Sequence, residues 1–251
     1  MSRFFAPKKN IDQEKSLIFI DGKEAHHIIN VMRLGELDDV IIFDGEGNEY
    51  IGSIFSIDTK NHRVIVKILS SHKGPLETPN EIHLLQAIPK KDKMEYIIEK
   101  ATELGVKKII PVITDRTIVR PDKMSSLSKN TRWNLISETS AKQCGRADIP
   151  EIAPIQKYDD ALKKWEEYSL ILCASLTKKN VYIKDALKKN TGNIQKILLM
   201  IGPEGDFSPE EISQIEDHPN CVLISLGKLV LKSDTAGLFA LSVISYELAM
   251  K

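Results

Sequence analysis

The sequence predicts two kinds of structure in succession: a small β-barrel, then an α/β domain with a mostly parallel sheet. Short apolar runs joined by polar turns fill the first 70 residues, a pattern typical of a small barrel. Residues 71–80 contain two prolines and a glycine without apolar periodicity, as a linker does. Beyond them, apolar runs alternate with helical segments, which indicates a parallel sheet covered on both faces.

The elements of the first part are short and follow one another closely. Strands are expected over residues 17–20, 40–43, 50–57 and 64–69. One helix is expected over residues 23–33. Short strands joined by such polar turns are typical of a small barrel.

The elements of the second part alternate between strand and helix. Strands are expected over residues 82–88, 107–112, 170–174, 197–201 and 222–225. Helices are expected over residues 90–104, 124–143 and 233–250. The first of these helices has an apolar stripe and is followed by Gly105, where a C-cap belongs. The last is apolar nearly all round, so the fold core or a partner subunit must cover it.

Composition excludes several classes of protein. Hydrophobic residues make up 42% and charged residues 28% of the 251 residues, which is typical of a globular protein with a substantial core. The three cysteines form no CxxC pair and the six histidines no HExxH pattern, so neither disulfides nor a metal site is expected. The N-terminus has no apolar signal region, and residues 235–250 are too short to span a bilayer. A cytoplasmic protein is therefore expected.

The charges are balanced overall but unevenly distributed. With 35 basic and 35 acidic residues, the net charge is zero, which argues against a general nucleic-acid binder. Residues 86–146, however, contain 13 Lys and Arg against 7 Asp and Glu. Residues 1–72 contain 9 against 11, so any nucleic-acid binding there must use a local patch. A local basic surface is predicted in the second part, because the local field matters more than the total.

Three strand ends point to a ligand site. The strand over residues 197–201 runs into the glycine-bounded loop 202–205, and Ser208 with Glu211 then forms a capping box at the start of a helix. Two further strands end at Leu176 and at Gly227. Ligands of open α/β sheets bind beyond the carboxyl ends of the strands, where glycines allow close backbone approach. Neither GxGxxG nor GxxxxGK[ST] occurs, so dinucleotide and P-loop sites lack their fingerprints.

These segments carry a resemblance to a known family. Residues 201–211 are similar to the pattern IGPEGGFS-x-x-E, and residues 226–236 to LG-x-x-ILR-x-ETA. Further elements match in order: Arg3-Phe4-Phe5, His26-His27 with residues 31–33, residues 100–106 with Pro111, and Gln143 with Arg146. Together they resemble the bacterial ribosomal RNA small subunit methyltransferase E family, within the SPOUT methyltransferases.

The resemblance implies both a fold and an activity. It implies a PUA-like β-barrel over residues 1–72, which binds RNA, and a SPOUT-type α/β domain with a C-terminal trefoil knot over residues 73–251. It also implies a homodimer that acts on 16S rRNA of the small ribosomal subunit. The implied reaction transfers a methyl group from S-adenosylmethionine to N3 of one uridine. No membrane or metal is implied.

The resemblance also implies roles for individual residues. The cofactor is expected to contact Leu176, Ile201, Gly202, Gly205, Leu226, Gly227 and Leu231. Glu204 orients the cofactor or accepts the N3 proton, or it only fixes its loop. Arg146 and Lys232 steady the uracil anion or a phosphate, or form surface ion pairs. Arg3, Phe5 and Arg33 are candidate RNA contacts, with core packing as the alternative for Phe5.

Three positions depart from the family pattern. Asp206 replaces the second glycine of GPEGG, Lys232 the arginine of ILR, and Asp234 the glutamate of ETA. Lysine keeps the charge but lacks the bidentate fork of arginine. Two alternatives therefore stay open: a non-catalytic RNA-binding or ribosome-assembly protein with a degenerate SPOUT site, and an α/β enzyme that acts on a small nucleotide. The barrel and the missing phosphate-loop fingerprints argue against the second.

Overall fold

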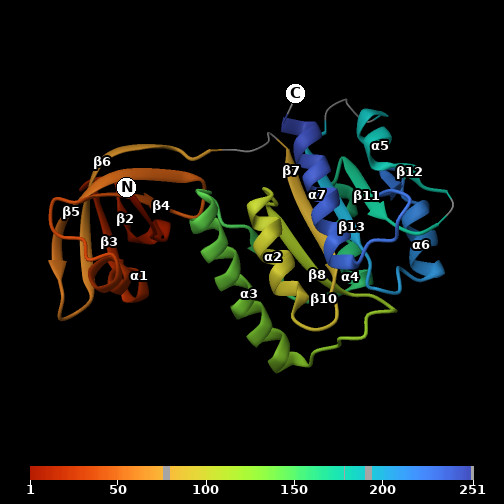
Figure 1. Ribbon diagram of the computed structural model, residues 1–251, viewed down its shortest axis with the longest axis horizontal. Coiled ribbons are helices and arrows are strands. Elements are labelled where there is room, and N and C mark those ends of the chain that lie inside the picture. The colour runs from red at the N-terminus through yellow and green to blue at the C-terminus, as the bar shows by residue number, and fades with distance from the viewer. Residues whose placement is uncertain (76–79, 178, 190–193, 250–251) are drawn as a thin grey trace. The chain divides into compact units, whose positions relative to one another are not determined.

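The computed structural model describes residues 1–75, 80–177, 179–189 and 194–249, and the chain divides into two compact units (Figure 1). Unit 1 comprises Met1–Leu76 and Ala141–Ile149, and unit 2 comprises Glu77–Ser140 and Pro150–Lys251. Part of the predicted linker, residues 76–79, lies outside the described residues. Its first residues belong to a strand that ends at Lys73.

Unit 1 is built on a six-stranded sheet with the order β1-β4-β5-β6-β3-β2. Its strands are β1 (Ser2–Phe5), β2 (Ile11–Asp12), β3 (Leu17–Asp21), β4 (Asp39–Phe43), β5 (Asn48–Asp58) and β6 (Arg63–Lys73). Only β1 and β4 pair in parallel; the other pairs are antiparallel. Alternate side chains such as Ile18, Ile42 and Val66 point inward and form one apolar core, as the period-2 pattern of a half-buried sheet requires.

The helix predicted over residues 23–33 differs in its second half. It is an α-helix only at α1 (Gly22–His26) and continues as a π-helical turn, η2 (His27–Val31), in which Met32 N donates to His27 O. A short 3₁₀ turn, η1 (Lys8–Asn10), precedes β2. Lys142 Nζ lies 2.8 Å from both carboxylate oxygens of Glu24 and 3.3 Å from His27 Nδ1, so it holds α1 and η2 at their junction.

The segment 141–149 completes unit 1 although the chain has by then passed through part of unit 2. Gly47 N donates to Ala147 O, and Ile149 N donates to Gly45 O. Ala147 also packs so closely on Gly74 that a Cβ at Gly74 would overlap it. The sequence predicts two continuous domains, residues 1–72 and 73–251, and does not predict this return of the chain.

Unit 2 is a parallel sheet with the order β10-β8-β7-β13-β11-β14-β12, with β9 beside β8. Its strands are β7 (Glu81–Ala87), β8 (Lys108–Ile113), β9 (Glu151–Ile152), β10 (Gln156–Lys157), β11 (Leu170–Ala174), β12 (Val181–Tyr182), β13 (Lys196–Ile201) and β14 (Cys221–Ser225). The predicted parallel sheet is confirmed. The adjacency of β13, β11 and β14 brings the three predicted strand ends to one edge.

Helices cover both faces of this sheet (Figure 1). They are α2 (Lys93–Glu103), α3 (Lys123–Cys144), α4 (Tyr158–Leu162), α5 (Ile183–Lys189), α6 (Pro209–Glu216) and α7 (Ser233–Ala249), with a 3₁₀ turn η3 (Trp165–Glu167). One apolar cluster packs α2, α5 and α7 on the sheet, and the other packs α4 and α6. Both faces are therefore buried, as the continuous apolar strands predicted.

One helix begins later than predicted, and another prediction extends beyond the described residues. The helix expected over residues 90–104 begins only at Lys93, because Lys91 has a φ of +60° and Asp92 is not helical. The last residue of the helix expected over 233–250 lies outside the described residues. Among the helices that the structure describes, none is long and apolar enough to cross a membrane.

His83 on β7 should make the stability of unit 2 depend on pH. Burial, followed by the charges of Lys196 and Lys108, lowers the pKa of His83 from 6.5 to about 4. Because the folded-state pKa lies below the unfolded value, the neutral ring stabilises the fold above pH 6.5. That stability is lost as the pH falls toward 4, by up to roughly 3 kcal/mol.

Urea unfolding followed by tryptophan fluorescence tests this prediction, because both tryptophans, Trp133 and Trp165, lie in unit 2. The His83→Gln variant should lose less stability than the wild type between pH 6.5 and pH 4. His26→Gln, at an exposed position, is the matched control. Identical pH slopes for the wild type and His83→Gln would contradict the prediction.

Candidate functional site

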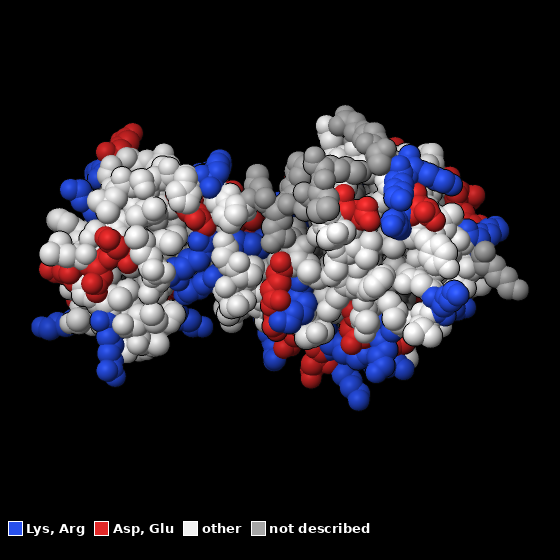
Figure 2. All heavy atoms as spheres, turned by 45° about the horizontal axis from the view of Figure 1, so that its top comes forward, with Lys and Arg blue, Asp and Glu red and all other residues white. Residues whose placement is uncertain are grey.

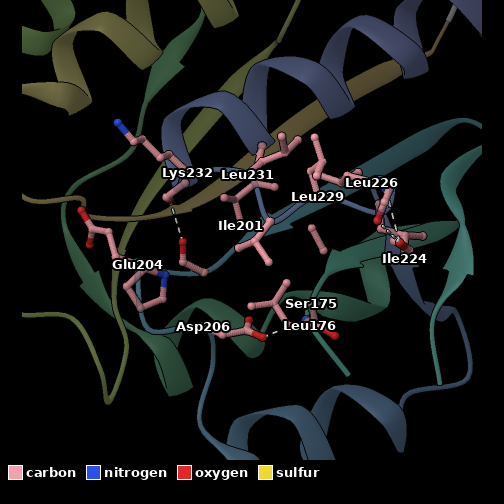
Figure 3. A pocket seen from close by; sticks show the side chains of 18 residues that line it. Ser175, Leu176, Ile201, Glu204, Asp206, Ile224, Leu226, Leu229, Leu231 and Lys232 are labelled. Atoms are coloured by element: carbon pink, nitrogen blue, oxygen red, sulfur yellow. Dashed lines mark hydrogen bonds between the residues drawn. The ribbon is translucent and has the colours of Figure 1, made fainter. Parts of the chain in front are cut away.

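The carboxyl ends of β11, β13 and β14 enclose a pocket of about 270 Å³ (Figure 3). The start of α7 closes it. Most of its walls are apolar side chains: Leu176, Ile201, Ile224, Leu226, Leu229, Val230 and Leu231. An apolar pocket with few polar groups is the usual form of a small-molecule site.

A buried chain of hydrogen bonds sets the shape of this pocket. Gln86 at the end of β7 is fully buried, and its Nε2 donates to Ser233 Oγ at 2.9 Å. Ser233 Oγ in turn donates to Gly202 O at 2.7 Å. One turn later, a Cβ at Gly237 would lie 3.2 Å from Gln86 Oε1. The first turn of α7 is thereby fixed against both β7 and the loop after β13.

The loop after β13 is tightly folded around Phe207. A Cβ at Gly202 would lie 3.2 Å from both Phe207 N and its ring, so only glycine fits there without displacement. Asp206 has a φ of +61°, the left-handed region that favours glycine. Its Oδ2 accepts from Leu176 N at 2.9 Å (Figure 3), and its Oδ1 accepts from Phe207 N at 2.8 Å. Asp206 thus joins the loop after β13 to the loop after β11.

The predicted capping box at the start of α6 is confirmed. Ser208 Oγ accepts from Glu211 N at 3.2 Å, and Glu211 Oε2 accepts from Ser208 N at 2.8 Å. The other carboxylate oxygen, Glu211 Oε1, accepts from Asp115 N at 2.9 Å. Burial raises the pKa of Glu211. The box therefore also attaches the loop after β8 to the loop after β13.

Charged side chains lie at the rim of the pocket. Glu204 and Lys232 are exposed and lie at the same end of the pocket (Figure 3). Glu204 Oε1 accepts from Lys90 N at 3.1 Å. Asp234 pairs with Lys93 Nζ at 3.0 Å, and although burial works in the opposite direction, this hydrogen bond lowers the pKa of Asp234. Among the described residues, no three or more His, Cys, Asp or Glu side chains gather to hold a metal.

The pocket brings together most of the residues that the sequence singled out. Six of the seven expected cofactor contacts line it, and so do Glu204 and Lys232. Gly205 is not part of the lining; its carbonyl accepts from Arg116 Nη1 at 2.7 Å. Glycine is not required at position 205. A Cβ there would lie 3.6 Å from the nearest atom of Arg116, and Gly205 does not have a positive φ.

The remaining candidates belong to unit 1. Arg146 is buried and pairs with Asp148 at 2.7 Å. Arg3 Nη1 lies 2.5 Å from Glu49 Oε1, and Arg3 Nη2 donates to Arg146 O at 2.8 Å. Phe5 is half-buried against Phe43, with ring centroids 5.4 Å apart. Arg33 is exposed and has a φ of +55°.

Sequence patterns did not indicate the residues that hold the pocket together. They are Gln86, Ser233, Lys90 and Arg116, and the bridging role of Asp206. Gln86 had a readable signal, because a single glutamine in the apolar run 82–88 must find a buried partner. The other contacts join residues far apart in sequence, for which no local pattern exists.

Ser233→Ala should destabilise unit 2 by about 1–3 kcal/mol, because it leaves the buried Gln86 Nε2 and Gly202 O without this partner. Urea unfolding followed by tryptophan fluorescence measures the loss. Ser242→Ala is the matched control in the same helix, since Ser242 is exposed and bonds only Leu238 O among the described residues. Equal losses of stability in the two variants would show that the buried hydrogen bonds of Ser233 do not stabilise unit 2 more than an exposed one does.

Comparison with known proteins places the chain in a family. Residues 76–245 match the RNA methyltransferase domain and residues 20–69 the RNA methyltransferase PUA domain. The chain is 29% identical to ribosomal RNA small subunit methyltransferase E of Bacillus subtilis, covering 98% of this chain and 97% of that protein. It is 30% identical to the protein of that name from Mesomycoplasma hyopneumoniae, covering 96% and 98%.

Solved structures agree with this placement. Ribosomal RNA small subunit methyltransferase E from Neisseria gonorrhoeae, bound to S-adenosyl methionine, has a TM-score of 0.84 at 29% identity and covers 98% of both chains. A methyltransferase from Legionella pneumophila, in complex with the cofactor SAM, has a TM-score of 0.83 at 32% identity and covers 98% of this chain and 97% of that chain. The chain therefore belongs to the ribosomal RNA small subunit methyltransferase E family, with an N-terminal PUA-like domain.

Proposed function

We propose that the chain transfers the methyl group of S-adenosylmethionine to N3 of a specific uridine in 16S rRNA of the small ribosomal subunit. The observation that carries the proposal is the pocket at three adjacent strand ends, with the Glu204 carboxylate at its rim. Family membership supports the same reaction, and two similar proteins of known structure bind this cofactor.

The chemistry of the pocket fits this cofactor. Its volume of about 270 Å³ is close to the lower end of the usual range for ligand pockets, roughly 300 Å³. Apolar walls such as Ile201 and Leu226 suit the adenine ring, and the backbone of the glycine loops can approach polar groups closely. Carboxylates at Glu204 and Asp206 complement the positive sulfonium and ammonium groups. When bound, the cofactor supplies an electrophilic methyl group.

The rim residues would prepare the acceptor nitrogen. N3 of uridine carries a proton that must leave before it can accept a methyl group, and Glu204 is a carboxylate placed to accept it. Lys232, at the same end, can stabilise the resulting anion as a point charge. The hydrogen bond from Lys90 N to Glu204 Oε1 holds that carboxylate in position. This is compatible both with a role in fixing the loop and with a role as the acceptor of the N3 proton.

Unit 1 is proposed to bind RNA through Arg3, Phe5 and Arg33, and Arg146 is proposed to contact uracil or phosphate. Arg33 is exposed and ready to do so. Arg3 and Arg146 face Glu49 and Asp148, so either would have to exchange a carboxylate for a phosphate. Both groups are oxyanions that suit the guanidinium fork.

The proposal also includes a trefoil knot at the C-terminal end of unit 2, a homodimer, and action in the cytoplasm. Knots are so rare that local physics alone argues against one, so the knot rests on family membership. Support for the dimer comes from apolar side chains at the pocket rim, where Leu229 is 82% and Val230 75% exposed. A second copy of the chain would cover such a patch.

The three departures from the family pattern support a working site rather than a degenerate one. Asp206 occupies a glycine-like conformation and is held by two backbone N–H groups. Asp234 keeps a cationic partner in Lys93. Lys232 retains a positive charge at the rim.

Methylation of small ribosomal subunits tests the reaction. Purified protein, methyl-labelled S-adenosylmethionine and subunits from a strain without this activity should yield labelled 3-methyluridine on nucleoside mass spectrometry. Label in another nucleoside would overturn the N3 assignment. No label, with subunits that a known family member methylates, would favour the non-catalytic alternative.

Glu204→Gln tests the proton acceptor. The amide keeps an oxygen for Lys90 N but cannot take a proton, so kcat should fall by roughly 10²–10⁴-fold. Calorimetric binding of S-adenosylmethionine should change far less. Glu210→Gln, at an exposed position on α6, is the matched control. Unchanged turnover in Glu204→Gln would leave Glu204 only its anchoring role.

A further inference from the structure

We propose that a cationic edge beside the pocket binds the phosphate backbone of the RNA next to the target nucleotide. This cationic edge consists of Lys90 and Lys91 in the loop after β7, and of Arg116 and Arg120 in the loop after β8. The inference rests on the proposed function and identifies where its substrate lies. Its four residues also account for part of the basic surplus of residues 86–146.

Sheet topology places the cationic edge on one side of the loop after β13 and the pocket on the other. The order β8-β7-β13-β11-β14 puts the loops after β8 and β7 on one flank of the loop after β13. The loops that form the pocket with it lie on the other flank. All five strands are parallel, so these loops share one edge of the sheet. Glu204 stands between the two sides.

The loops after β7 and β8 are both attached directly to the loop after β13. Lys90 N donates to Glu204 Oε1 at 3.1 Å. Arg116 Nη1 donates to Gly205 O at 2.7 Å and to Phe207 O at 3.2 Å. Phosphates bound here would therefore be placed relative to Glu204 and not to a separate surface.

The loop after β7 is held in a costly conformation. Lys91 has a φ of +60°, a left-handed conformation that is unfavourable for a residue with a Cβ. Lys91 lies in the loop between β7, which ends at Ala87, and α2, which begins only at Lys93. Lys90 and Lys91 are both exposed on this loop. Strain retained at a functional edge is consistent with a binding role.

The charges of this edge are not neutralised by ion pairs. Within the part of the chain that the structure describes, Lys90 and Lys91 have no carboxylate within ion-pair distance, and Arg116 and Arg120 donate to backbone carbonyls. Several other cations of unit 2 are paired, as in Lys93–Asp234, Lys108–Glu151 and Arg132–Glu95. On the face drawn in Figure 2, acidic and basic side chains are likewise interspersed.

The nearby carboxylates accept hydrogen bonds from the protein itself. Glu204 accepts from Lys90 N, and Asp115 Oδ2 accepts from Ser208 Oγ at 2.9 Å. Asp92, next to Lys91, is exposed. The cationic head groups thus remain available to an anion, and the backbone of RNA is the anion that the proposed reaction brings to this edge. Such contacts position RNA without reading its sequence.

The double variant Lys90→Gln/Lys91→Gln tests the inference. It removes two charges but keeps the backbone N–H that holds Glu204. Filter binding to transcribed 16S rRNA at several salt concentrations should show weaker binding. The slope of log K against log salt should become shallower by about 1.4–1.8, the value for two phosphate contacts. With small subunits as substrate, KM should rise more than kcat falls.

The matched control is Lys188→Gln/Lys189→Gln on α5. Both lysines are exposed and unpaired among the described residues, and α5 ends at the opposite edge of the sheet, where β13 begins (Figure 1). An equal loss of binding in the control and the test variant would overturn the inference, as would an unchanged salt slope. Calorimetric binding of S-adenosylmethionine separates the two hypotheses: a wild type that fails to bind it refutes the proposed function, whereas normal cofactor binding with unaltered RNA binding refutes only the cationic edge.

Discussion

The pocket depends on one buried hydrogen-bond chain, from Gln86 through Ser233 to Gly202. Its three members come from the end of β7, the first turn of α7 and the loop after β13. A buried amide or hydroxyl without a partner is costly, so each segment can only settle where the other two are already in place. This mutual requirement gives an apolar sheet, which by itself could pack in several ways, a defined edge.

The loop after β13 is the centre of a second layer of contacts. Asp206 bonds it to the loop after β11, Glu211 and Arg116 to the loop after β8, and Glu204 to the loop after β7. Each neighbouring strand end thus supplies or receives a hydrogen bond from this loop. A site held from all sides loses little freedom when a ligand binds, which favours affinity. The position of Glu204 therefore depends on the loops after β7, β8 and β11 as well as on its own loop.

Much of this arrangement could be predicted from the sequence, and the rest has identifiable physical reasons for escaping prediction. Strands such as 170–174 were found because apolar runs bounded by turn residues are a local signal. The start of α2 differs from the prediction because Lys91 has a φ of +60°, a left-handed conformation for which lysine has no local preference. The three strand ends could be named from motifs. Their joining by Asp206 could not, because Asp206 and Leu176 lie thirty residues apart.

The return of residues 141–149 to unit 1 has a consequence for how the protein is made. The chain passes between the units three times, so unit 1 is not a continuous stretch of sequence. Lys142, which bonds Glu24, and Arg146, whose carbonyl accepts from Arg3, leave the ribosome only after residues 77–140 of unit 2. Domains usually fold in order of synthesis, but unit 1 cannot be completed until residues 77–140 of unit 2 have also been made. Because both units are discontinuous in sequence, no single division of the gene encodes each unit separately.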